Sequence, residues 1–257
     1  MLRAAGVCVT GPAHLEAGEP GQDALSLRGW CGGWLAAVAD GLGSRPMSAQ
    51  GARLAVQAAQ TCLRARGSQA LDIANTRAIA TEVYRHWLRQ RPGYGNPSQA
   101  ACTLLAAACD AQGRVQTWQI GDGMVVACLG GQVQVLTPGR TGFGNQTQAL
   151  GVDKQWSAWQ TAQLHLRRPG DLVLLMTDGV ADDLPEAALP GFVRALHREL
   201  QHRNRRQARQ WLRHELTYWA TPGHSDDKTL VVIYKDEQHG KSREDEYGRQ
   251  QEAAVGS

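Results

Sequence analysis

Two continuous apolar runs, residues 34–39 and 172–176, are each followed closely by an Asp-Gly pair. A short continuous apolar run that stops at turn residues is typical of a strand buried on both faces. Aspartate and glycine then provide the turn by which the chain leaves the sheet. The two runs therefore predict buried strands that each have an aspartate at the end, Asp40 after the first and Asp178 after the second.

The remaining pattern divides the chain into groups of strands separated by pairs of helices. We expect three short strands between residues 5 and 40 with a loop at 11–22, helices at 46–66 and 72–90, strands between 101 and 136, a long loop at 138–160, the strand at 172–176, helices at 186–202 and 206–220, and a last strand at 229–234. Strands do not alternate with single helices, which argues against a doubly wound parallel sheet. Gly130-Gly131 between two apolar runs indicates a tight hairpin. We therefore expect an α+β fold with helices on the outer faces of antiparallel sheets.

The chain contains no internal repeat and no sign of a second domain. Its 257 residues are enough for one large domain with a substantial core. From residue 236 onward the sequence is polar and charged, and a segment of that composition cannot offset the entropy lost on folding. We expect one domain over residues 1–235 and a disordered tail over 236–257.

Composition excludes several classes of protein. A net charge of +3 is too small to argue for a nucleic-acid partner, and no apolar run approaches the roughly 20 residues of a membrane helix. The six cysteines form no C-x-x-C pair, which fits a reducing cytoplasm, although an even number leaves disulfides open. Seven arginines between residues 194 and 214 favour solvated helix faces. Docking to an acidic partner is the alternative interpretation of these arginines.

Further aspartates lie at predicted strand ends. Asp122 follows a strand, Asp226 and Asp227 precede the last strand, and Asp23 begins the second. Magnesium and manganese prefer oxygen ligands such as carboxylates, and two such ions can bridge and activate a water for attack at phosphorus. Asp-Gly after a strand is also a common turn, so any single aspartate is more often a turn residue than a ligand. The order and spacing of the whole set favour a metal site.

Six short motifs occur in one order along the chain: Gly-Gln-Asp (21–23), Val-Ala-Asp-Gly-Leu-Gly (38–43), Ala-Cys-Thr-Leu (101–104), Ile-Gly-Asp-Gly (120–123), Leu-Met-Thr-Asp-Gly-Val-Ala-Asp (175–182) and Ser-Asp-Asp-Lys-Thr-Leu-Val-Val (225–232). The series resembles the type 2C, metal-dependent protein phosphatases over residues 6–235. His14 followed by Gly18-Glu19-Pro20-Gly21-Gln22-Asp23, together with Asn145-Gln146-Thr147, is similar to a bacterial subgroup of that family. The resemblance implies a four-layer α-β-β-α sandwich of two antiparallel sheets.

The resemblance also implies a reaction and a set of roles. The reaction is hydrolysis of phosphoserine or phosphothreonine in a protein substrate, opposing a serine/threonine kinase, by a water that bridges two Mn or Mg ions. Asp40 would bridge the two ions and the Gly41 carbonyl would bind one of them, while Asp23, Asp178 and Asp226 would complete the site. Asp122 would help to hold a third, weaker ion, and Asp182 would be an outer carboxylate.

Three positions depart from the family pattern. Gly18 stands where the family usually has a phosphate-binding arginine, Leu42 replaces a histidine proposed as general acid in eukaryotic members, and Met124 replaces a common arginine. His14 is a candidate replacement for the phosphate contact, and a solvated loop histidine is the alternative. The departures leave open a second interpretation of the whole chain, a weak or inactive phosphatase-like module that binds a phosphoprotein.

Overall fold

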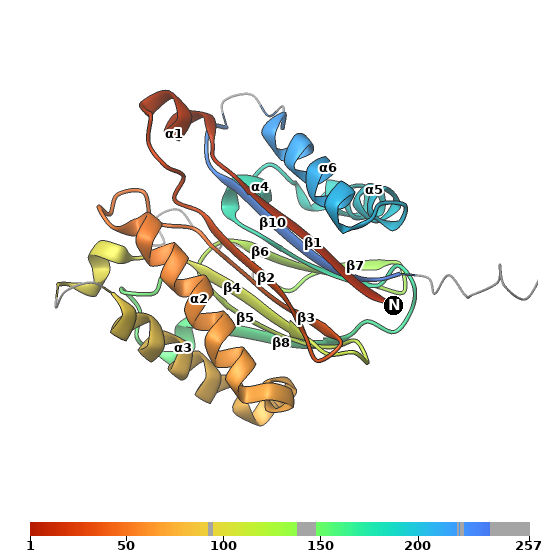
Figure 1. The fold of residues 1–257 in the computed structure, drawn as a ribbon, viewed down its shortest axis with the longest axis horizontal. Coiled ribbons are helices and arrows are strands. Elements are labelled where there is room, and N and C mark those ends of the chain that lie inside the picture. Colours follow the sequence, from red (N-terminus) through yellow and green to blue (C-terminus); the bar gives the residue numbers. More distant parts are fainter. Residues whose placement is uncertain (92–94, 138–147, 220, 222–223, 237–257) are drawn as a thin grey trace, which may run out of the picture.

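The computed structural model describes residues 1–91, 95–137, 148–219, 221 and 224–236, and within them ten strands form two antiparallel five-stranded sheets. The first sheet contains, in spatial order, β1 (Leu2–Val9), β10 (Lys228–Lys235), β9 (Leu172–Met176), β6 (Met124–Leu129) and β7 (Gln132–Val135). The second contains β2 (Ala24–Trp30), β3 (Gly33–Ala39), β4 (Leu104–Cys109), β5 (Arg114–Ile120) and β8 (Gln160–His165). The edge strands β1 and β2 are close to one another (Figure 1).

A pair of long helices covers the outer face of each sheet (Figure 1). The helices α2 (Ser48–Arg66) and α3 (Thr76–Gln90) share one apolar core with the second sheet. The helices α5 (Leu189–Gln201) and α6 (Arg205–Thr217) share another with the first sheet. A third core lies between the sheets. The expected four-layer α-β-β-α sandwich is confirmed.

The buried strand β3 shows why its sequence is apolar without interruption. Side chains of successive strand residues point to opposite faces of a sheet. Leu35 and Ala37 pack in the core under the helices, whereas Ala36 and Val38 pack between the sheets. Both faces of β3 are covered, so every position needs an apolar side chain.

The structure also contains elements that the sequence pattern did not predict. The expected loop at 11–22 contains the short helix α1 (Pro12–Ala17), which ends at Gly18 in the left-handed conformation with φ of 69°. The expected loop at 138–160 is followed directly by the edge strand β8, whose mixed polar sequence lacks a long apolar run. Residues 138–147, including Asn145-Gln146-Thr147, lie outside the described residues, as does the tail from residue 237.

Short helices complete the chain between the main elements. They are α4 (Asp178–Ala181) and the 3₁₀ helices η1 (Gly67–Leu71), η2 (Ile73–Asn75), η3 (Pro97–Ala100), η4 (Trp156–Ala158) and η5 (Glu186–Ala188). All six cysteines are described, and none of them forms a disulfide. In the described part of the chain, no helix has the length and apolar character needed to cross a bilayer.

Candidate metal centre

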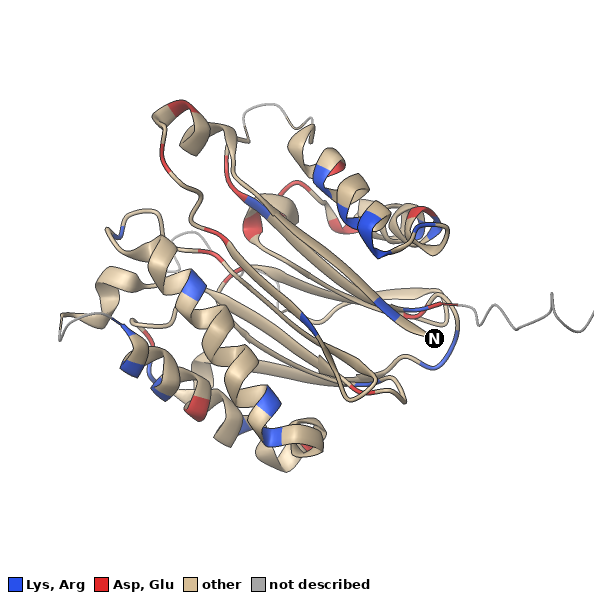
Figure 2. Ribbon diagram, viewed as in Figure 1, with Lys and Arg blue, Asp and Glu red and all other residues tan. Residues whose placement is uncertain are grey.

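Aspartates from four separate segments line one cavity of about 250 Å³. Asp40 follows β3, Asp122 follows β5, Asp178 follows β9, and Asp226 precedes β10. The full lining consists of His14, Gln22, Asp40, Gly41, Leu42, Gly43, Ser44, Asp122, Asp178 and Asp226. Acidic segments are visible in the loops at this end of the sandwich (Figure 2). The structure thus brings together residues that are up to 212 positions apart, from His14 to Asp226.

Thr103 holds the backbone of Asp40 in place. The Asp40 N–H donates to the Thr103 hydroxyl at 2.9 Å, and the Thr103 N–H donates to the Asp40 carbonyl at 2.7 Å. Gly121 lies directly against this threonine with φ of 111°, and an added Cβ there would lie 2.5 Å from the Thr103 side chain. Glycine is therefore required beside Asp122. Thr103 therefore links the position of Asp40, through hydrogen bonds, to that of Asp122, through its contact with Gly121.

The sequence predicts no role for Asp227, and the structure shows that it organises one wall of the cavity. Its side chain is 2% exposed. It accepts hydrogen bonds from the backbone N–H of Gly11 at 2.7 Å and of Asp23 at 3.3 Å, and from Gln22. Its Oδ1 also lies 3.0 Å from His14 Nδ1. Asp227 therefore ties the segment that carries His14 and Asp23 to the start of β10.

His14 lines the cavity from helix α1. Because an ionised carboxylate only accepts hydrogen bonds, the contact with Asp227 places a proton on His14 Nδ1 and leaves Nε2 for a ligand. Arg45, next to the lining residue Ser44, is exposed. Lys228 is buried and its Nζ donates to the Asp226 carbonyl at 3.1 Å. These three basic side chains lie in the cavity lining or close to it in the sequence.

Asp23 lies beneath the cavity and is absent from its lining. Its carboxylate is buried and accepts a hydrogen bond from the Thr177 hydroxyl at 2.8 Å. Thr177 in turn accepts a hydrogen bond from the Thr229 N–H at 3.0 Å. Asp23 is thus fixed between the ends of β9 and β10.

The carboxylates perturb one another. Burial, followed by the negative charges of Asp23, Asp178 and Asp226, raises the pKa of Asp40 far above its ordinary value. Burial also raises the pKa of Asp23. Burial and then the charges of Asp122, Asp226 and Asp182 raise the pKa of Asp178 to about 6. Like charges that share a partly desolvated site favour protonation or cation binding.

The residue types fit hard divalent cations, although their side chains are not arranged as a closed coordination site. Within the described residues, no three His, Cys, Asp or Glu side chains form a group that could hold a metal ion as they stand. The negative charges of Asp178 and Asp226 nevertheless contribute to the raised pKa of Asp40, and the charge of Asp226 contributes to the raised pKa of Asp178, so the three carboxylates share one electrostatic environment. Oxygen donors around a solvent-containing cavity are what magnesium and manganese prefer. Asp182, predicted as an outer carboxylate, is exposed, and its N–H donates to the Asp178 carbonyl at 2.8 Å.

A family model described as "Protein phosphatase 2C" matches residues 10–217. This chain belongs to the protein phosphatase 2C family. The matched range contains six of the eight predicted site residues on the cavity wall or beneath it, namely His14, Asp23, Asp40, Gly41, Asp122 and Asp178. No curated protein sequence matches the chain significantly.

Solved structures of this family share the fold. The chain is similar to the photosystem II phosphatase PBCP (14% identity, TM-score 0.63), with 92% of this chain and 99% of that chain covered. It is similar to PppA, described as a regulatory component of T6SS in Pseudomonas aeruginosa (20% identity, TM-score 0.63, 91% and 97% covered). It is also similar to the catalytic domain of the serine threonine protein phosphatase PstP in complex with two manganese ions (19% identity, TM-score 0.63, 92% and 99% covered).

The three departures from the family pattern are visible in the structure. Gly18 ends α1 and an added Cβ there would meet nothing within 4 Å, so a side chain at this position would be free to extend. Leu42 lines the cavity with an apolar side chain, which cannot transfer a proton. Met124 begins β6 and packs against the core under α5 and α6.

Proposed function

We propose that this chain is a metal-dependent phosphatase that hydrolyses phosphoserine or phosphothreonine in proteins, opposing a serine/threonine kinase in the bacterial cytoplasm. The observation that carries the proposal is the convergence of Asp40, Asp122, Asp178 and Asp226 on one cavity in a protein phosphatase 2C chain. The manganese bound to the similar PstP structure supports the choice of metal.

In this proposal Asp40, Asp178 and Asp226 hold two Mn or Mg ions from the wall of the cavity and Asp23 supports them from beneath. The Gly41 carbonyl provides a further oxygen, and Asp122 holds a third, weaker ion. Bound ions would neutralise phosphate charge and activate a water for in-line attack at phosphorus. The three raised pKa values support cation binding, because a cation would offset both the burial of the carboxylates and the repulsion between them that raise these pKa values.

In this proposal His14 orients the substrate. His14 is held by Asp227 with Nε2 left for a phosphate oxygen. Since Nδ1 already carries a proton, Nε2 donates to the phosphate only when the ring is doubly protonated. A positioned donor helps to align the phosphoryl group for attack. His14 thereby takes the role that an arginine at Gly18 would have had.

The test is a turnover assay with p-nitrophenyl phosphate and with a phosphothreonine peptide, each with manganese, with magnesium and with excess chelator. The proposal requires release of phosphate in both metals and none in chelator. Turnover that persists in chelator would exclude the metal mechanism.

A second candidate function is a phosphoprotein-binding module with little or no turnover. The observation in its favour is Leu42, which leaves the cavity wall without a side-chain proton donor at that position. Isothermal titration with the same phosphopeptide distinguishes the two functions. Binding in metal without phosphate release would favour the module.

A further inference from the structure

A groove of about 530 Å³ lies between the edges of the two sheets. Its floor is formed by β1 and β2 through Ala4, Ala5, Gly6, Leu25 and Leu27, which are small or apolar. The two strands approach closely, because an added Cβ at Gly6 would lie 3.2 Å from Leu25 Cδ1. Each strand is the outermost member of its sheet, so each presents backbone groups on the side that faces away from its only strand partner.

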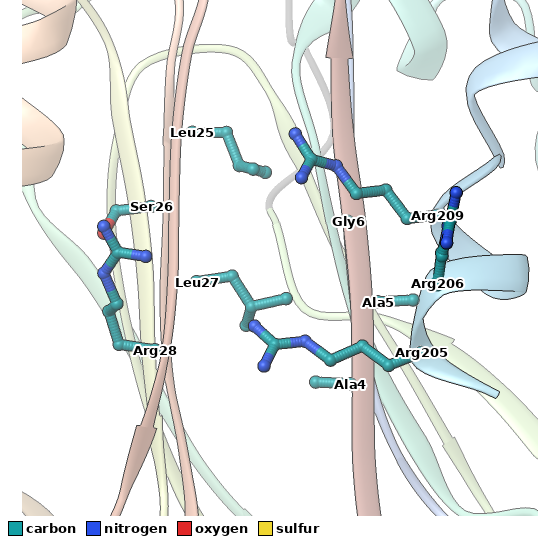
Figure 3. A pocket seen from close by; sticks show the side chains of 10 residues that line it. All are labelled: Ala4, Ala5, Gly6, Leu25, Ser26, Leu27, Arg28, Arg205, Arg206 and Arg209. Carbon is teal, nitrogen blue, oxygen red and sulfur yellow. The ribbon is translucent and has the colours of Figure 1, made fainter.

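Four arginines line this groove. Arg28 stands on β2 beside Ser26, and Arg205, Arg206 and Arg209 come from the first two turns of α6. Arg205 and Arg209 extend from the helix across β1 toward Leu27 and Leu25 (Figure 3). All four are exposed. The groove therefore combines an apolar floor with basic walls.

The arginines have no acidic partner in the described part of the chain. No ion pair there involves Arg28, Arg205, Arg206 or Arg209, whereas Arg203 on the same connection pairs with Glu199 at 2.8 Å. The Arg205 guanidinium lies over the Trp34 ring at 5.4 Å, which holds it across the end of the groove. Four guanidinium groups around one groove create a positive potential that an anionic ligand would complement.

The groove lies along a strand that begins next to the candidate metal centre. The strand β2 begins at Ala24, immediately after Asp23. At about 3.3 Å per strand residue, Ser26 lies roughly 10 Å and Arg28 roughly 17 Å along β2 from Asp23. We consider a substrate peptide in extended conformation that runs alongside β2. Its residues three to six positions away from the phosphorylated residue would lie beside the arginines.

We propose that this basic groove binds an extended acidic segment of the phosphoprotein substrate, three to six residues from the phosphorylated side chain. Glutamate and aspartate side chains would pair with the arginines, and the free edges of β1 and β2 can bond the peptide backbone as an added strand. The proposal rests on the proposed function, and it specifies which substrates the enzyme prefers. It also gives a partner to three arginines of the run at residues 194–214, namely Arg205, Arg206 and Arg209, in place of a purely solvated helix face.

The test compares two phosphothreonine peptides that differ only in carrying glutamate or glutamine at positions three to six on both sides of the phosphothreonine. We expect kcat/KM to be about tenfold higher for the glutamate peptide at low salt, and the preference to disappear at about 0.5 M NaCl, because salt screens exposed charges. The double variant Arg205→Glu/Arg209→Glu should abolish this preference, so that kcat/KM is about equal for the two peptides. The single variant Arg28→Glu on the opposite wall should do the same. Turnover of p-nitrophenyl phosphate should stay within about twofold of the parent chain.

The matched control is Arg77→Glu/Arg85→Glu, which reverses two exposed arginines on α3, on the other side of the sandwich. This variant should keep the full preference. A preference that is absent from the parent chain, or that survives in the Arg205→Glu/Arg209→Glu variant, would overturn the proposal.

Binding measured by fluorescence anisotropy separates this inference from the proposed function. A fluorescein-labelled, unphosphorylated glutamate peptide should bind the parent chain and lose at least about tenfold in affinity with the double variant. If no phosphatase substrate is turned over and this binding persists, the proposed function fails while the groove remains an acidic-peptide site.

Three other results would reassign the groove and so overturn the proposal. Glutamate-peptide binding that appears only after deletion of residues 238–257 would identify the chain's own tail as the occupant. A dimer in light scattering that the double variant dissociates would identify a second copy. Stronger competition by oligo-dT than by the peptide would identify a nucleic acid.

Discussion

Asp227 Oδ1 lies 3.0 Å from His14 Nδ1, although 213 positions separate the two residues in the sequence. The same carboxylate accepts a hydrogen bond from the backbone N–H of Gly11, so it holds both the start of helix α1 and the histidine that this helix carries. Asp227 therefore acts as a positioning residue for one wall of the cavity, and this role can be tested.

Asp227→Asn should destabilise the protein and lower its activity together. The amide replaces one acceptor oxygen by a donor that faces backbone N–H groups, and a buried group left unsatisfied costs about 1–3 kcal/mol. Thermal unfolding in chelator, followed by the turnover assay, measures both effects. Asp226→Asn is the control, because its side chain lines the cavity and its loss should reduce turnover without lowering the melting temperature in chelator. Equal stability of both variants would contradict the positioning role.

His14→Ala should raise KM or lower kcat by about tenfold, which corresponds to roughly 1.4 kcal/mol. Metal affinity and melting temperature should barely change, since the histidine contacts Asp227 rather than the other carboxylates. His14→Arg should restore part of the activity if positive charge is the essential property. Unchanged kinetics in the alanine variant would show that His14 does not contact the phosphate. Arg45 and Lys228 would then become the next candidates for this contact. Arg140 is a further candidate that lies outside the described residues.

Asp40→Asn and Asp178→Asn should each lower turnover by at least about 100-fold. This loss would exceed the roughly 10- to 100-fold that is typical when a residue hydrogen-bonded to a metal ligand is changed. Each substitution keeps the shape of the side chain and removes a charge that would hold the ions. Asp122→Asn should be milder and should appear mainly as a changed dependence on metal concentration. Circular dichroism confirms that the fold is kept, and near-parental turnover of either of the first two variants would contradict its assignment.

The chelated protein should become less stable as the pH rises from about 4 to 8. A pKa that is higher in the folded than in the unfolded chain stabilises the fold at low pH, and that contribution is lost as the pH rises. Asp178 loses its contribution through a pKa of about 6, and the raised pKa values of Asp23 and Asp40 extend the effect upward. Saturating manganese should raise the melting temperature at pH 8 and flatten the profile. A chelated protein with a flat profile would contradict the shared electrostatic environment.

Deletion of residues 238–257 should leave the melting temperature and the turnover of p-nitrophenyl phosphate almost unchanged. The segment is polar and has few side chains able to pack against an apolar surface. Differential scanning fluorimetry and the turnover assay on the shortened chain provide the measurement. A fall of several degrees in melting temperature would show that the tail packs against the domain.

The sequence by itself determined the buried strands and the aspartates that end them. Residues 34–39 and 172–176 became β3 and β9, and Asp40 and Asp178, which follow these strands, line one cavity. This information is local, because an apolar run specifies burial and an Asp-Gly pair specifies a turn within a few residues. The helix pairs were also predictable, since apolar residues recur there at helical spacing.

Elements with weak local patterns could not be predicted in this way. The helix α1 has no buried residue, and the edge strand β8 has one partner and a mixed polar sequence. Their positions depend on what the rest of the fold places beside them, and short segments without an apolar face carry little signal of their own.

Only the tertiary structure decided which distant residues act together. Asp227 reaches Gly11 across 216 positions of sequence, and the groove joins Arg28 to Arg209 because two sheet edges meet beneath α6. A hydrogen bond or a shared electrostatic potential depends on distance in space, and neither leaves a periodic trace along the chain. The sequence therefore pointed to the carboxylates at the strand ends, whereas the packing of two sheets decided that they share one cavity and that a basic groove lies along the sheet edges.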